Sequence, residues 1–300
     1  MQHSPPHPER EDLVQDLSLK KIILLTTTRG GERQKEIKTL INSVEMSRAE
    51  MHGSEVHHYI LIQGAAEPFD CLQDSASNAF LHVACTPELV SLSRARNMML
   101  GQIAQTDSLT GSVIGFPDDD AWYPSGTLAG ILQSFREDDL LDLWFCQCGT
   151  NPAWSSTLPG KRPRLQEMYS NATSNSIFVR GCLAGKIGAF DETLGLGTSA
   201  VSGEDSDFAV RAFRTGRNAR FVEAQLVGHR EHGARDREFY FGGALRVIAR
   251  YARDLPGGYF ALARKCLVGA ALAIMGRIPL QQLMLDYRRA FSGFNVSGRD

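Results

Sequence analysis

The stretch SVIGFPDDDAWYP, residues 112–124, places three consecutive aspartates directly after a short apolar run. The apolar run predicts a buried strand, so Asp118, Asp119 and Asp120 come at its carboxyl end. Adjacent carboxylates repel one another, and crowding them costs stability unless a cation neutralises them. Hard cations such as Mg²⁺ and Mn²⁺ prefer oxygen ligands. The motif therefore predicts a metal-binding strand end, with a solvated acidic turn as the alternative.

Short apolar runs alternate with amphipathic stretches over residues 20–229. Strands are expected near 20–28, 57–64, 79–86, 112–116, 141–148, 176–180 and 219–229. Helices are expected near 33–51, 92–106, 125–137 and 203–216, and a further helix follows the strand expected within 174–192. Residues 149–167 are expected to form a loop. This β-α-β order predicts an α/β fold with a largely parallel sheet. Ligands bind at the carboxyl ends of strands in such sheets, where the aspartates lie.

The bulk composition indicates a globular protein rather than a nucleic-acid binder. Of 300 residues, 43% are hydrophobic, and the formal net charge is −2. Residues 234–300 carry 11 Lys/Arg and 5 Asp/Glu, a net of +6, so residues 1–233 carry −8. A nucleic-acid binder would have a basic body. A basic C-terminal region instead fits contact with an anionic surface.

The cysteines and the N-terminal residues indicate the cellular compartment in which the protein is expected. The six cysteines are scattered without a zinc-binding spacing, so we expect free thiols in a reducing cytoplasm. Residues 1–20 contain no apolar core of the kind found in a signal peptide. We therefore expect a disordered tail at 1–20.

Two further groups of polar residues follow the aspartates. Glu204 and Asp205 occupy the first turn of the helix expected at 203–216, where acids also stabilise the helix dipole. His229 ends the last apolar run and offers a third metal ligand. His232 competes for that role, and either histidine could instead be structural.

The order of these motifs over residues 21–232 resembles the family 2 glycosyltransferases of GT-A fold. IILLTTTRG is similar to the first strand of that family, which places Thr26 and Arg29 at the nucleotide. SLSRARNMML matches its Ser-x-x-Arg-Asn helix at Arg96 and Asn97. FPDDDAWYP matches its D-x-D strand end, and GAFDETLGLGTSAVSGEDSDF matches its Gly-rich loop and Glu-Asp helix. One departure is Gln63, which ends the second strand where the family usually has a base-reading Asp.

The resemblance implies a mixed sheet flanked by helices at 21–232, followed by a basic amphipathic helical extension at 233–300. It implies an inverting transferase that moves a sugar from a nucleotide-diphosphate donor to a hydroxyl acceptor. A divalent cation, Mn²⁺ or Mg²⁺, would bind Asp118, Asp120 and His229. The catalytic base would be Asp205, with Glu204 as the alternative. The remaining donor-binding residues would be Thr26, Arg29, Gln63, Arg96, Asn97, Asp118 and Asp119.

Two rival functions share some of these features. A nucleotide-sugar-binding protein without turnover would not need Asp205. A nucleotidyltransferase also uses paired carboxylates and a metal, but it usually carries a phosphate-binding loop that TTRGGERQK only faintly resembles.

Trp122 and Tyr123 could stack on a sugar or a base, or could pack locally.

The segment 257–290 is the most apolar part of the chain. Its longest uncharged run, residues 266–276, is 11 residues, too short to span a bilayer, which takes about 20. Arg264, Lys265 and Arg277 flank this run. The segment either packs on the catalytic domain or lies in a membrane interface with its cations toward anionic lipid. Because similar bacterial enzymes assemble surface polysaccharides on glycan or lipid-linked acceptors, we expect peripheral attachment at the inner face of the plasma membrane.

Overall fold

One mixed β-sheet forms the centre of the protein in a computed structural model that describes residues 19–29, 33–69, 72, 79–106, 109–230 and 238–292. Within these residues the sheet has eight strands in the order β3-β2-β1-β4-β7-β5-β8-β6. They are β1 (Lys21–Arg29), β2 (Glu55–Gln63), β3 (Leu81–Thr86), β4 (Ser112–Gly115), β5 (Leu141–Gly149), β6 (Gly160–Lys161), β7 (Phe178–Arg180) and β8 (Asn218–Gly228).

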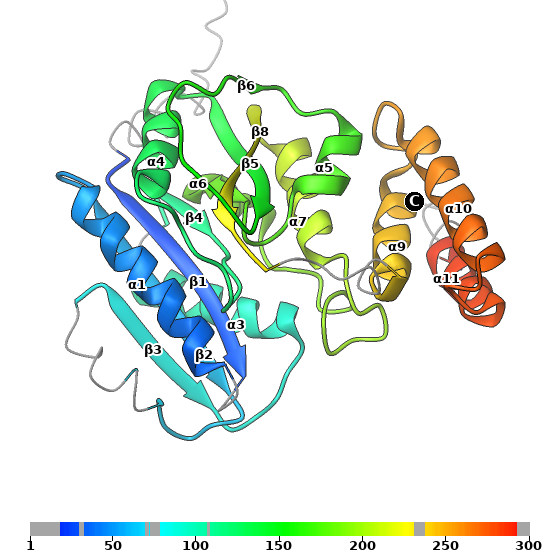
Figure 1. Cartoon of the computed structure of the whole chain (residues 1–300), viewed down its shortest axis with the longest axis horizontal. Helices are drawn as coiled ribbons and strands as arrows, with labels where there is room; N and C mark the ends of the chain where they lie inside the picture. Colours follow the sequence, from blue (N-terminus) through cyan, green and yellow to red (C-terminus); the bar gives the residue numbers. More distant parts are fainter. Residues whose placement is uncertain are drawn as a thin grey trace, which may run out of the picture.

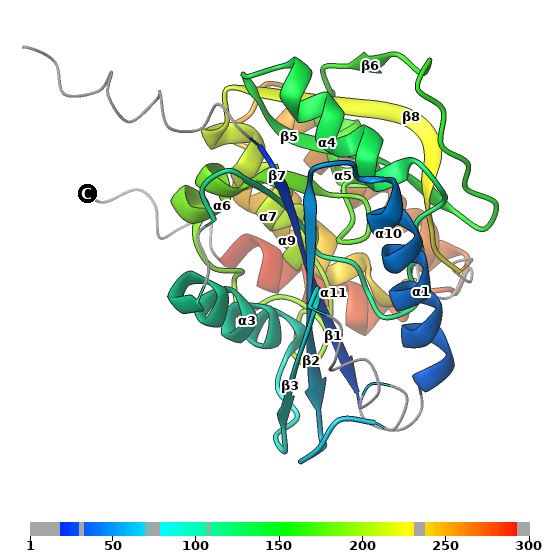
Figure 2. The same ribbon diagram turned by 90° about the vertical axis from the view of Figure 1, so that its left-hand side faces the viewer.

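Helices cover both faces of this sheet (Figures 1 and 2). On one face lie α1 (Gln34–Glu50) and α4 (Thr127–Glu137), whose apolar residues pack into one core cluster with β1 and β5. On the other lie α3 (Leu92–Thr106), α5 (Leu165–Asn171), α6 (Gly181–Ile187) and α7 (Glu204–Thr215). Strands buried on both faces need continuous apolar runs, which is why β1 and β4 are so hydrophobic.

The prediction of an α/β fold is confirmed, but the sheet is less parallel than the rhythm of the sequence suggested. β1, β2, β3 and β4 run parallel, as do β5 and β8. β7 runs antiparallel between β4 and β5, and β6 pairs antiparallel with β8. β6 and the start of α5 fall in the stretch 149–167 that was expected to be a loop.

The reversal of β7 matters for the site. Because β7 is antiparallel, Phe178 at its start pairs with Gly115 at the end of β4. The residues that lead into β7 therefore lie at the same sheet edge as the aspartates after β4. This arrangement brings Ser174 and Asn175 to Asp118.

The chain termini fit the predicted organisation only in part. Residues 1–18 of the expected N-terminal tail lie outside the described residues. Leu19, which the prediction included in that tail, is only 4% exposed and packs into the core. The expectation of a tail extending to residue 20 is therefore wrong at its last residues.

The described part of the C-terminal region, residues 238–292, contains the helices α9 (Phe241–Tyr251), α10 (Gly258–Ile274) and α11 (Leu280–Ser292). They share a core cluster of their own and lie together at one end of the molecule (Figure 1). α9 packs against α7. Asp207 of α7 is buried there, and its carboxylate accepts hydrogen bonds from Arg250 Nη1 at 2.7 Å and the Tyr251 hydroxyl at 2.8 Å.

We expect Asp207→Ala to destabilise the protein by about 3 kcal/mol, because it removes a buried carboxylate that accepts hydrogen bonds from Arg250 and Arg211 and leaves the buried Tyr251 hydroxyl without its acceptor. The matched control is Asp139→Ala, since Asp139 is exposed. Urea denaturation of both variants measures the free energy of unfolding. Equal stability of the two variants would show that the Asp207 contacts do not hold α9 on α7.

Candidate functional site

A cavity of about 600 Å³ opens at the carboxyl edge of the sheet. Its walls come from the ends of β1 and β2, the loop after β4, the segment before β7, the start of α7 and the residues after β8. The aspartate triplet, the Glu204–Asp205 pair and His229 all line it, so the structure brings together the three groups that the sequence singled out.

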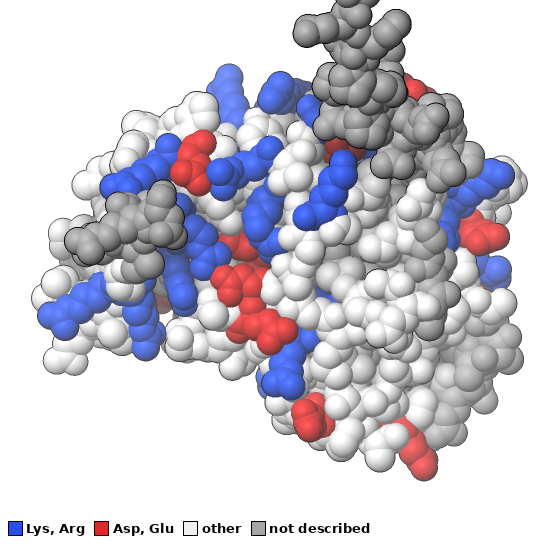
Figure 3. Space-filling view, turned by 180° about the vertical axis from the view of Figure 1, so that it is seen from behind, with Lys and Arg blue, Asp and Glu red and all other residues white. Residues whose placement is uncertain are grey.

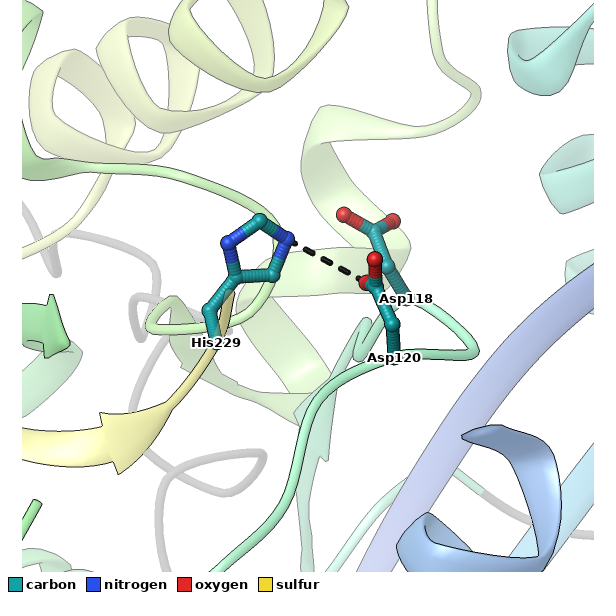
Figure 4. A group of neighbouring side chains, drawn as sticks. All are labelled: Asp118, Asp120 and His229. Carbon is teal, nitrogen blue, oxygen red and sulfur yellow. Dashed lines mark ion pairs between the residues drawn. The ribbon is translucent and has the colours of Figure 1, made fainter. Parts of the chain in front are cut away.

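Asp118, Asp120 and His229 form a candidate metal site. One ligand atom from each lies within 4.8 Å of the others (Figure 4). His229 Nε2 is 3.2 Å from Asp120 Oδ1, while Nδ1 lies 2.8 Å from the carbonyl oxygen of Arg230. A proton on Nδ1 satisfies that carbonyl and turns Nε2 toward the carboxylates, the orientation that a metal ligand needs. Two carboxylates and an imidazole fit Mn²⁺ or Mg²⁺.

Asp119, the middle aspartate, turns away from this group. Its carboxylate accepts hydrogen bonds from the Thr28 hydroxyl and from Arg33 Nη1, both at 2.6 Å. Asp119 is therefore held by β1 and Arg33 and is not part of the candidate metal site. The sequence did not predict that Thr28 and Arg33 would be its partners.

Two arginines neutralise Asp120. Arg230 Nε lies 2.9 Å from its Oδ2 and Arg33 Nη1 lies 3.2 Å from the same oxygen. Burial alone would raise the pKa of Asp120, but His229, Arg230 and Arg33 outweigh it and lower the pKa to about 2. Asp120 is therefore ionised throughout the physiological range.

Arg96 is buried behind the cavity, with 2% of its side chain exposed. Its guanidinium donates to Asp205 Oδ1 at 2.6 Å and to Asp118 Oδ1 at 3.0 Å, and it lies 5.3 Å from the centre of the Phe190 ring. Arg96 was expected to bind the donor. The structure instead uses it to join the aspartate triplet to the first turn of α7, because both of its carboxylate partners lie between it and the cavity.

Asp205 and Glu204 occupy different environments. Asp205 Oδ2 accepts the Ser174 backbone N–H at 2.9 Å, so both of its oxygens have donors. Glu204 is buried, and its Oε2 has no hydrogen-bond partner among the described residues. Burial, with repulsion from Asp205, raises the pKa of Glu204 to about 8 despite the attraction of Arg96. Asp205 therefore differs from Glu204 in having a hydrogen-bond donor at each carboxylate oxygen.

The other predicted donor-binding residues divide into two groups. Arg29 and Gln63 line the cavity. Thr26 lies three residues before the end of β1, where its hydroxyl is buried 2.9 Å from His58 Nε2. The Asn97 amide donates to the Phe190 carbonyl and accepts its N–H, which fixes the Phe-Asp-Glu segment. Thr26 and Asn97 are therefore structural residues in this arrangement.

The aromatic pair after the triplet packs locally. Trp122 forms two backbone hydrogen bonds with Gly228, and Tyr123 is buried with its ring against Phe178. Neither residue lines the cavity, so stacking on a ligand is not supported. His232, the alternative metal ligand, lies outside the described residues.

Four cavity residues escaped sequence reasoning. Ser174 and Asn175 reach Asp118 Oδ2 at 3.2 Å each, and the Asn175 side-chain oxygen accepts the Asp118 N–H at 2.6 Å. Only the direction of β7 brings them there, and no local pattern encodes it. Arg33 lies four residues after Arg29 at the end of the first strand, and Arg230 directly follows His229. This closeness to recognised motifs is the one signal in the sequence that could have indicated them.

Comparisons with known proteins give the fold. No protein-family model and no curated protein matches the sequence. Among solved structures, S. aureus TarS matches with a TM-score of 0.57 and 16% identity over 93% of this chain and 46% of that chain. The TarS 1-349 structure in complex with UDP-GlcNAc matches with a TM-score of 0.57 and 17% identity over 93% of this chain and 76% of that chain.

A third match is the mannosyltransferase PcManGT from Pyrobaculum calidifontis in complex with GDP-Man and Mn2+. It has a TM-score of 0.55 and 15% identity, covering 94% of this chain and 83% of that chain. The mixed sheet, the helices on both faces and these likenesses establish that the chain has the GT-A fold. The chain spans about 46% of the length of the first of these chains.

The raised pKa of Glu204 gives a pH-dependent stability. Its pKa is about 8 in the folded protein and about 4.5 in the unfolded chain, so its contribution is complete below pH 4.5 and is lost as the pH rises through 8. Gln is neutral at every pH and escapes this loss. We therefore expect Glu204→Gln to melt about 5 °C above the wild type at pH 9 and within about 1 °C of it at pH 4.5. Thermal melts without divalent cations measure the Tm of both proteins. A Tm difference that stays constant from pH 4.5 to 9 would contradict the prediction.

Proposed function

We propose that the protein is an inverting, metal-dependent glycosyltransferase that moves a sugar from a nucleotide-diphosphate donor to a hydroxyl acceptor. The observation that carries the proposal is one cavity that holds both a three-ligand cation site and a separate, hydrogen-bonded carboxylate at Asp205. Its GT-A neighbours include one structure with UDP-GlcNAc and one with GDP-Man and Mn2+.

Asp118, Asp120 and His229 would hold the divalent cation. When bound, the cation neutralises negative charge that develops on the leaving diphosphate. Arg33 and Arg230 contact Asp120 from the cavity side. Once a cation takes over the neutralisation of Asp120, these arginines can turn to the phosphates, which are the stronger anions.

Asp205 acts as the base. The acceptor hydroxyl has a high pKa, so its proton must leave as the new glycosidic bond forms. That proton moves to the Asp205 carboxylate, which Arg96 and the Ser174 N–H orient. The hydroxyl attacks from the side opposite the diphosphate, so the anomeric configuration inverts. Glu204 has a raised pKa and does not serve as this base.

The donor occupies the side of the cavity built by β1 and β2. Thr28 and Arg29 end β1, and Gln63 ends β2. The Gln63 side-chain oxygen accepts the Val90 N–H at 2.9 Å. Because this oxygen is already occupied, Gln63 would offer its side-chain NH₂ group to a nucleotide base. An NH₂ donor suits a carbonyl oxygen on the base.

Asp205→Asn should lower the transfer rate by about 10²–10⁴-fold, because an amide cannot accept the acceptor's proton. The variant should bind the nucleoside diphosphate in the presence of Mn²⁺ with a Kd close to that of the wild type. Release of nucleoside diphosphate from a panel of nucleotide sugars, with lipid-linked glycans as acceptors, measures the rate, and Asp139→Asn is the control.

Three outcomes would contradict this function. Donor binding without turnover would indicate a nucleotide-sugar-binding protein. Pyrophosphate release from a nucleoside triphosphate would indicate a nucleotidyltransferase. Retention of the donor's anomeric configuration in the product would contradict the direct displacement.

We also propose that the C-terminal helices attach the enzyme to an anionic membrane surface at the cytoplasmic face, where it acts on lipid-linked acceptors for cell-surface glycans. None of the described helices is long and apolar enough to cross a bilayer. On α10, Phe260, Leu267 and Ile274 recur every seven residues and are 76%, 71% and 87% exposed. Figure 3 shows Lys and Arg gathered over this end of the molecule. An apolar stripe beside cations fits a headgroup interface of opposite charge.

We expect the wild type to co-sediment with phosphatidylglycerol-containing liposomes at low salt and to be released as the salt rises. Leu267→Glu should weaken this binding about tenfold or more. Met46→Glu is the control, since Met46 is equally exposed on α1, away from the C-terminal helices. An absence of wild-type binding at low salt would rule out the membrane contact.

A further inference from the structure

The C-terminal region reaches into the cavity through the start of α9. Tyr240, the residue before α9, and Ala244 in its first turn both line the cavity. The donor residues proposed above come from β1 and β2, at the other side of α7 in Figure 1. Tyr240 and Ala244 therefore belong to the side of the cavity away from the nucleotide.

The backbone of α9 lies directly against the loop that leads into α7. The Ser202 hydroxyl donates to the Tyr240 carbonyl at 2.9 Å. Gly243 has no room for a side chain, because a Cβ there would lie 2.2 Å from the Ser202 carbonyl oxygen. A Cβ on Gly203, whose φ is +101°, would lie 2.9 Å from the Gly243 carbonyl oxygen.

The same loop holds a strained residue. Val201 has φ of +60°, and it is the one non-glycine residue with positive φ in the described part of the chain. Such a conformation costs a β-branched residue about 1–3 kcal/mol and persists only where surrounding contacts fix it. Val201 lines the cavity next to Ser202, so the contact with α9 supplies this constraint at the site itself.

A second contact holds α7 from its far side. Asp205 and Asp207 are two residues apart, about 200° around the helix, so one faces the cavity while the other faces α9. Asp207 binds Arg250 and Tyr251 of α9. Contacts on both sides of Glu204 and Asp205 therefore set the rotation and the position of the first turn of α7.

We infer that α9 positions the base Asp205 and forms the acceptor wall of the cavity through Tyr240 and Ala244. This inference rests on the proposed glycosyltransferase function. The base must lie within hydrogen-bond distance of the acceptor hydroxyl, and a displacement of about 1 Å can cost about 10²-fold in rate. The donor side does not include α9, so donor binding is independent of it.

Two adjacent glycines test the inference with matched chemistry. Gly243→Ala forces the Ser202 backbone away, whereas the atoms nearest to the Cβ that Gly242→Ala adds belong to the Asp286 side chain of α11, which can move. Both changes raise the helix propensity equally. We expect Gly243→Ala to lower kcat about 10–100-fold with the Kd of nucleoside diphosphate and Mn²⁺ within about twofold of wild type. Gly242→Ala should keep the wild-type kcat.

Tyr240→Ala provides a variant that removes no backbone contact. Truncating this wall should raise the acceptor KM at least fivefold, again with the diphosphate Kd unchanged. Thermal melts report whether each variant is folded. A folded Gly243→Ala that behaves like Gly242→Ala, or that loses donor affinity in proportion to kcat, would overturn the positioning role. An unchanged acceptor KM in Tyr240→Ala would overturn the acceptor wall.

These failures differ from a failure of the proposed function. If the wild type binds the diphosphate but transfers no sugar, the function is wrong and this inference falls with it. If the wild type transfers sugar, but Gly243→Ala behaves like Gly242→Ala and Tyr240→Ala keeps the wild-type acceptor KM, only the role of α9 is wrong.

Discussion

The buried guanidinium of Arg96 is the interaction on which the site depends. It joins Asp118, after the central strand β4, to Asp205, at the start of α7, with hydrogen bonds of 3.0 and 2.6 Å. Removing either partner would leave the buried guanidinium with one hydrogen-bonded carboxylate in place of two, which is destabilising. The arginine therefore fixes the position of Asp118, in the candidate cation site, relative to Asp205, the proposed base.

The opening puzzle of three adjacent aspartates has an electrostatic answer. Each carboxylate has its own cations: Arg96 for Asp118, Arg33 for Asp119, and His229, Arg33 and Arg230 for Asp120. The crowding is thus stable in the free protein. Because Arg33 and Arg230 are more exposed than Arg96, they can move when a cation and a diphosphate arrive, whereas Arg96 stays.

Local sequence patterns predicted most of the helices and strands, whereas the contacts between distant residues could be seen only in the structure. The resemblance to the family 2 glycosyltransferases grouped the aspartates, Asp205 and His229 in one site, and the periodicity of the sequence located α1, α3, α4 and α7 and the strands before each motif. It could not give the direction of β7, since strand pairing depends on distant residues, and so it missed Ser174 and Asn175. The resemblance to the family 2 glycosyltransferases assigned Arg96 to the donor, whereas the structure buries this side chain between Asp118 and Asp205. The same resemblance assigned Thr26 to the nucleotide, whereas the cavity lining begins one residue further along β1, at Thr27.

The proposed function depends on whether Asp118, Asp120 and His229 hold a cation that binds a nucleoside diphosphate. A thermal-shift panel of UDP, GDP, dTDP and CMP, each with and without Mn²⁺, on the wild type and Asp120→Asn measures this. We expect one diphosphate to raise the Tm of the wild type only with Mn²⁺, and we expect the variant to lose this rise. No shift with any nucleotide, or a shift that needs neither Mn²⁺ nor Asp120, would contradict it.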